Sequence, residues 1–61
     1  MTEQELIESE ELAKQLYAKV AESYVTYFPL EDKYMCHVWG KPLSGMRSKR
    51  IDAIREALTQ A

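Results

Sequence analysis

The chain has 61 residues, of which 46% are hydrophobic and 30% are charged, and its net charge at pH 7 is −2. This length allows one small domain, residues 1–61, and the aromatic and aliphatic content excludes a disordered chain. Its one cysteine excludes an internal disulfide, and no apolar run approaches the roughly 20 residues of a membrane span. We therefore expect a cytoplasmic globular protein. A core this small is marginal, so a second copy or a protein partner is an expected source of stability.

The charges are distributed unevenly between the two halves. Residues 1–32 hold eight acidic and two basic side chains, whereas residues 33–61 hold six basic and two acidic ones. Such asymmetry is typical of a chain whose basic end faces a polyanion.

Residues 1–28 predict a long, acidic, amphipathic helix. Thr2 followed by Glu5 fits a capping box, in which the Thr2 hydroxyl accepts from the amide of Glu5. Pro29 disfavours helical geometry at the preceding residue, so the helix should end near Tyr27. Apolar residues recur at i+4 along one face: Leu12, Leu16, Val20, Tyr24 and Phe28.

This apolar stripe has two interpretations. It can pack on the C-terminal half and complete a monomeric core, or it can pair with a second copy or another protein. In the second case the interface comprises Leu12, Leu16, Tyr17, Val20 and Tyr24.

Residues 30–40 are ambiguous. As a helix they would begin after Pro29 and stop at Gly40. As a strand, Tyr34, Cys36 and Val38 would alternate with Met35 and His37. The helix is favoured because no second strand is visible for pairing. We expect Trp39 to anchor the following turn in the core; the alternative is an exposed stacking or interface residue.

Neighbouring Cys36 and His37 do not predict a reactive centre. No other Cys or His is present to complete a tetrahedral metal site, and no third group orients a thiol–imidazole pair. A buried or half-buried cysteine beside a surface histidine is expected. The sequence predicts no metal, no cofactor and no enzymatic activity.

A final helix is expected after an extended link at Pro42, with Ser44 as its N-cap and Gly45 in its first turn. Ile51, Ile54 and Leu58 then form one apolar face. With the two preceding helices, this predicts an all-α, three-helix protein.

The start of this helix is unusually basic. Arg47, Lys49 and Arg50 would lie in its first two turns, where cations oppose the helix dipole. An anion at the free amides would relieve that repulsion, so the pattern indicates a phosphate site.

The residues Gly40, Pro42, Ser44, Gly45 and Arg47, followed by Ile51 and Ile54, resemble the second half of a SAP domain, a helix–extension–helix module of DNA-associated proteins. The similarity covers residues 30–58. It implies binding of duplex DNA through backbone phosphates, with Ser44, the Gly45 amide and Arg47 as contacts. Lys41, Lys49 and Arg50 join this nucleic-acid site on charge alone. Such binding should be weak and salt-dependent.

Two functions follow from the sequence. The leading hypothesis is a small non-enzymatic protein that binds duplex DNA through the N-terminus of its last helix, and is then nucleoid-associated. The alternative is a regulator or inhibitor that binds a protein through its acidic N-terminal helix.

Overall fold

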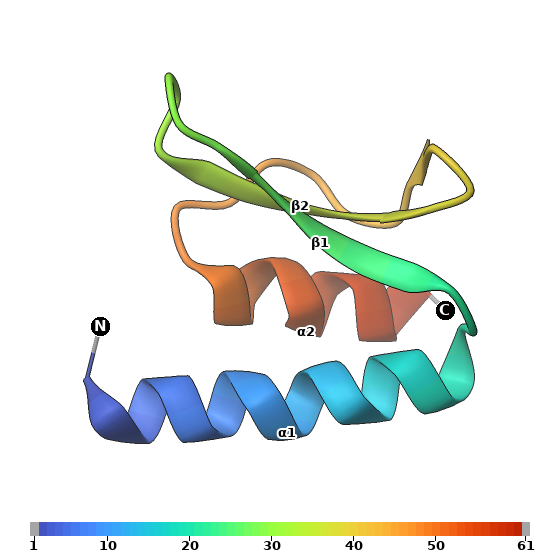
Figure 1. Cartoon of the computed structure of the whole chain (residues 1–61), viewed down its shortest axis with the longest axis horizontal. Coiled ribbons are helices and arrows are strands. Elements are labelled where there is room, and N and C mark those ends of the chain that lie inside the picture. Colours follow the sequence, from blue (N-terminus) through green and yellow to red (C-terminus); the bar gives the residue numbers. More distant parts are fainter. Residues whose placement is uncertain (1, 61) are drawn as a thin grey trace.

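The computed structural model describes residues 2–60; Met1, where the predicted first helix begins, and Ala61, where the predicted domain ends, lie outside this range. The all-α prediction is wrong, because three strands separate two helices (Figure 1). The elements are α1 (Glu3–Lys19), β1 (Ser23–Phe28), β2 (Lys33–Val38), β3 (Lys41–Pro42) and α2 (Arg50–Gln60). Neither helix in residues 2–60 is long and apolar enough to cross a membrane.

Helix α1 begins as predicted but ends earlier. The Glu5 amide donates to the Thr2 hydroxyl over 3.1 Å, which confirms the N-cap. The helix ends at Lys19 instead of near Tyr27, and Glu22 adopts a left-handed φ of 65°. The i+4 spacing that continued the stripe is misleading, because the residues beyond it are mostly aromatic or β-branched and prefer a strand.

Strands β1 and β2 form an antiparallel hairpin in which Val25 lies opposite Cys36. The helix predicted for residues 30–40 is therefore wrong, and the strand alternative describes β2. The second strand is formed by residues 23–28, which the i+4 pattern places in the first helix. The two assignments failed together because each strand is stable only when the other is present.

A two-residue turn at Trp39 and Gly40 joins β2 to β3. Both residues have positive φ, 53° and 77°, which is the geometry of a type I′ turn. Gly40 adopts it without strain, whereas a bulky side chain at positive φ is an outlier. Trp39 is also 76% exposed, so its predicted role as a core anchor is wrong.

Helix α2 starts at Arg50, six residues later than the Ser44 N-cap predicted from the sequence. Arg47 is held in extended geometry by two backbone hydrogen bonds with Tyr34, of 2.7 and 2.9 Å. Ser44 is used in the sheet: its hydroxyl accepts from the Cys36 amide over 3.0 Å. The segment 43–47 thus continues the edge of β2 and delays the helix.

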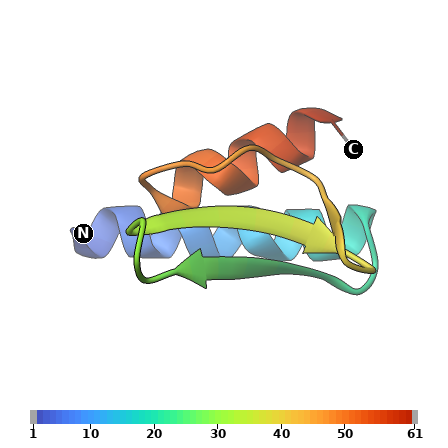
Figure 2. The same cartoon turned by 90° about the horizontal axis from the view of Figure 1, so that it is seen from above.

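Both helices pack on one face of the sheet, whose strand order is β1-β2-β3 (Figure 2). The buried apolar core lies between these two layers. Its members are Ala13, Leu16, Cys36, Ala53, Ile54 and Ala57. No element among residues 2–60 covers the opposite face of the sheet.

The strain at Trp39 leads to a stability prediction. We expect Trp39→Asn to raise the free energy of unfolding by about 1 kcal/mol, because Asn tolerates positive φ better than other non-glycine residues. Urea unfolding measures this change. Trp39→Ala is the control, since it removes the ring without favouring the left-handed region. Equal stabilities of the Asn and Ala variants would contradict strain at this turn.

Candidate interaction surfaces

The uncovered face of the sheet is the most distinctive surface of this protein, and we call it the open face. The register places alternate residues of the hairpin on it, while their neighbours face the helices. The open face comprises Tyr24, Thr26, Phe28, Lys33, Met35, His37 and Pro42. Trp39 adjoins it in the turn that follows His37.

The centre of the open face is aromatic. The rings of Tyr24 and His37 stack at a centroid distance of 5.6 Å and an angle of 14°. The Thr26 hydroxyl lies 3.1 Å from Nδ1 of His37 and fixes the imidazole. Tyr24 remains 43% exposed despite this contact. The face is therefore partly preorganised and still accessible.

The strands of the hairpin carry little charge. Strands β1 and β2 contain no carboxylate, and Lys33 is the charged residue of the open face. The turn that joins the two strands contains Glu31 and Asp32, and five of the ten acidic residues lie on α1, on the other side of the sheet. A partner that meets the open face would therefore bury aromatic and apolar groups with few charges.

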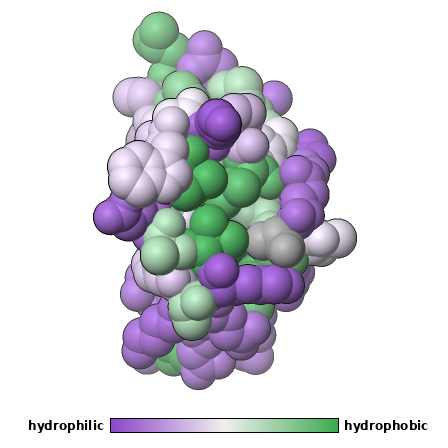
Figure 3. Space-filling view, turned by 90° about the vertical axis from the view of Figure 1, so that its right-hand side faces the viewer, coloured by the Kyte–Doolittle hydropathy of each residue, from purple (hydrophilic) through white to green (hydrophobic). Residues whose placement is uncertain are grey.

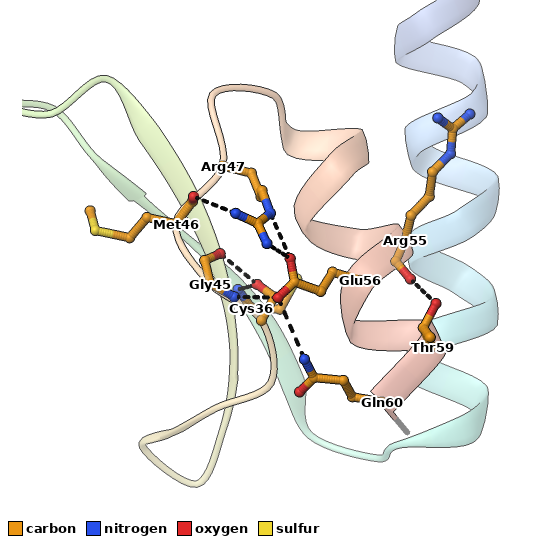
Figure 4. Close-up of polar contacts among 9 residues, drawn as sticks. Cys36, Gly45, Met46, Arg47, Arg55, Glu56, Thr59 and Gln60 are labelled. Atoms are coloured by element: carbon orange, nitrogen blue, oxygen red, sulfur yellow. Dashed lines mark hydrogen bonds and ion pairs between the residues drawn. The ribbon is translucent and has the colours of Figure 1, made fainter.

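The phosphate site predicted at the start of the last helix is occupied by the protein itself (Figure 4). Ser44 is buried, and the Gly45 amide donates to Oε1 of Glu56 over 2.9 Å. The Arg47 guanidinium donates to Oε2 of the same carboxylate, with Nε at 2.6 Å. Glu56, which the sequence analysis did not single out, thus takes the place expected for an anion.

The remaining cations divide into two groups. Arg50 donates to the Ser9 hydroxyl over 2.9 Å and lies 3.5 Å from Glu10. Lys41 and Lys49 are exposed, and neither forms an ion pair within residues 2–60. Of the six predicted nucleic-acid contacts, Ser44 is buried, and the groups of Gly45, Arg47 and Arg50 are hydrogen-bonded within the chain.

The predicted partner interface on α1 is also divided. Leu16 is completely buried in the core, and Leu12 and Val20 pack partly against it, as in the monomeric interpretation. Tyr17 is exposed on α1, whereas Tyr24 belongs to the open face of the sheet. These five residues therefore do not form one contact surface.

A second apolar area lies at the end of the molecule where both helices finish. Figure 3 shows hydrophobic side chains gathered at the centre of this end, with hydrophilic ones around and below them. Val20, Leu43 and Leu58 are partly buried residues that pack against the core. They belong to the segments that meet at this end.

Cys36 is buried, as the sequence predicts. It is fully buried, and burial raises the pKa of its thiol, while the nearby Ser44 hydroxyl opposes this shift. Residues 2–60 contain no cluster of three or more potential metal ligands and no detectable cavity.

Sequence reasoning missed most of the open face. The i+4 pattern places Phe28 in a helical stripe, and the sequence indicates no functional role for Met35 or His37. The available signal was the period-two alternation of aromatic and β-branched residues from 23 to 28, followed by a second alternating run.

The contacts of Glu56 predict a pH dependence. The hydrogen bond from the Gly45 amide, followed by the contacts with Arg47, lowers the pKa of the Glu56 carboxyl despite an opposing effect of burial. Since the folded pKa is lowered, its stabilisation is present above the unfolded value and is lost as pH falls below about 4.3. Glu56→Gln should lower stability at pH 7 and reduce its further loss in acid.

Urea unfolding at pH 7 and at a series of acidic pH values checks this prediction. Glu31→Gln is the matched control, because Glu31 is exposed in the turn between β1 and β2. If both variants show the parent's pH dependence, the proposed role of Glu56 is wrong.

Burial of Leu16 predicts a large effect on stability. Leu16→Ala should reduce the free energy of unfolding by about 3 kcal/mol, because it leaves a cavity between helices and sheet. Tyr17→Ala should change it by less than about 1 kcal/mol. Denaturant titrations of both variants test this. A larger loss of stability in Tyr17→Ala than in Leu16→Ala would contradict the burial of Leu16 as the main contribution of this stripe to the core.

Comparison with models of protein families, with curated proteins and with solved structures gives no match. The SAP-like pattern therefore rests on residues of this chain alone. The first helix that this resemblance implies is not formed, since residues 33–38 are strand β2.

Proposed function

We propose that this protein is a small non-catalytic binding module that recognises a protein partner through the open face of its sheet. The observation that carries the proposal is an uncovered sheet face with stacked, accessible aromatic residues. This retains the protein partner of the alternative hypothesis and moves the contact from α1 to the sheet.

The composition of the open face supports a protein partner. Protein interfaces are enriched in Tyr, Trp, Phe and Met at their centres and depleted of carboxylates. Tyr24, Phe28, Met35 and the adjoining Trp39 follow this pattern, and the hairpin strands contain no acidic residue. Exposed aromatic and apolar side chains gathered on one face are typical of interaction sites in small soluble proteins.

The conformation of Trp39 gives independent support. An exposed tryptophan at positive φ destabilises the free protein and contributes little to its core. Strained residues of this type cluster at functional sites. A large, exposed aromatic side chain in the turn that follows His37 is well suited to a contact that dominates binding energy.

Duplex DNA binding stays a prediction and has weaker support. The amide and guanidinium groups expected to meet phosphate are bonded to Glu56. Lys41 and Lys49 provide only two cations, and few phosphate contacts give weak, strongly salt-dependent binding.

Site-specific photo-crosslinking in the producing cells tests the proposal. A benzophenone amino acid at position Met35 should crosslink to a distinct protein, whereas the same group at exposed Gln15 on α1 should not. Tyr24→Ser and Trp39→Asn should each reduce the Met35 crosslink by about tenfold or more, because such aromatic contacts contribute about 2 kcal/mol. Ile7→Ser, an exposed change on α1, is the matched control and should leave it unchanged.

Two results would contradict the proposal. One is a partner that crosslinks from Gln15 but not from Met35. The other is low-salt binding of duplex DNA that is lost in Lys41→Ala plus Lys49→Ala and unaffected by Tyr24→Ser. A product that contains only two copies of this chain does not count as a partner.

A further inference from the structure

The outer edge of β1 is a free hydrogen-bonding edge. β1 is the terminal strand of the sheet, and β2 occupies its inner side. Figure 2 shows no other segment beside its outer side in the part of the chain that the structure describes. The backbone groups of β1 that point away from β2 are therefore available to pair with another strand.

The hydrogen bonds of β2 reveal which groups of β1 point outward. Tyr34 and Cys36 direct their backbone groups away from β1, toward Arg47 and Leu43. Their neighbours in β2 must then bond to β1, because alternate residues of a strand bond to opposite sides. In the register of the hairpin, Val25 and Tyr27, which lie opposite Cys36 and Tyr34, present their amide and carbonyl groups to the outer edge.

This edge lacks the usual protection against pairing. Natural edge strands are interrupted by Lys, Pro or a bulge, or are very short. β1 has the sequence SYVTYF, with no charged residue and no proline, and pairs without a bulge over all six residues. Its composition is close to that of a central strand.

We propose that β1 pairs in antiparallel fashion with β1 of a second copy of this chain, around a twofold axis at Thr26. Val25 then lies opposite Tyr27 of the other copy, and Tyr24 lies opposite Phe28. The outward amides and carbonyls of Val25 and Tyr27 form about four intermolecular hydrogen bonds.

The sequence of β1 favours a second copy over an unrelated strand, because the strand is complementary to itself in this register. Each cross-strand pair is of a favourable type: aromatic with aromatic, β-branched with aromatic, and threonine with threonine. Residues of the open face meet residues of the open face, so the alternation is preserved. A twofold contact also requires such self-complementarity.

The pairing would give one continuous six-stranded sheet with both open faces on the same side. It also supplies the extra stability that a single small core lacks. This inference concerns the edge of the sheet and does not depend on what the open face binds.

Sedimentation equilibrium of the full chain over micromolar to millimolar concentrations tests the pairing. We expect the mass to rise from that of one chain to that of two. Thr26→Lys and Thr26→Glu should each abolish the rise, because like charges lie opposite each other at the axis. An equimolar mixture of these variants should restore the dimer, since opposite charges then meet.

Met35→Lys is the matched control, because Met35 lies beside Thr26 on the same face but one strand inside the edge. It should leave the dimer intact. Amide exchange gives a second readout: the Val25 and Tyr27 amides should exchange more slowly as concentration rises. A single-chain mass at all concentrations, or a dimer that survives both Thr26 substitutions, would overturn the proposal. Circular dichroism of each variant verifies that the monomer remains folded.

Discussion

The structure depends on the pairing of β1 with β2 in the register that sets Val25 opposite Cys36. Because side chains alternate along a strand, this register places one set of residues under the helices and the other on the open face. A shift of one residue would exchange the two sets, exposing Cys36 and burying Lys33 and His37. Core formation, the position of Ser44 and the composition of the open face all follow from this hairpin.

Two ion pairs within the molecule join the acidic first half to the basic second half. Arg55 lies 3.7 Å from Glu8 and Arg50 lies 3.5 Å from Glu10, so the cations of α2 face the acids of α1. Such exposed pairs are individually weak. They place two cations of the second half against two acids of the first, so part of the charge asymmetry is balanced inside the molecule.

Two features of the sheet support the proposed contacts with a partner and with a second copy. Trp39 is exposed at positive φ, and β1 has an unprotected edge. A protein selected only to fold alone would favour Asn in the turn and a charge on the edge strand. A small domain with one helical layer cannot cover both faces of its sheet, so the open face is left to water or, as we propose, to a protein partner.

The sequence by itself determined the local features: the cap at Thr2, the first four turns of α1, the apolar face of α2 and the burial of Cys36. It also contained the alternation of β2, although this was the less favoured interpretation. Tertiary structure decided where α1 ends, because residues 20–28 fit both helical and strand patterns until β2 is present. It also decided which anion contacts the basic cluster. Glu56 binds Gly45 and Arg47, although it is eleven residues from the first and nine from the second in sequence. Local propensity cannot select between such alternatives; long-range pairing and burial do, because they contribute more free energy than the small differences in propensity.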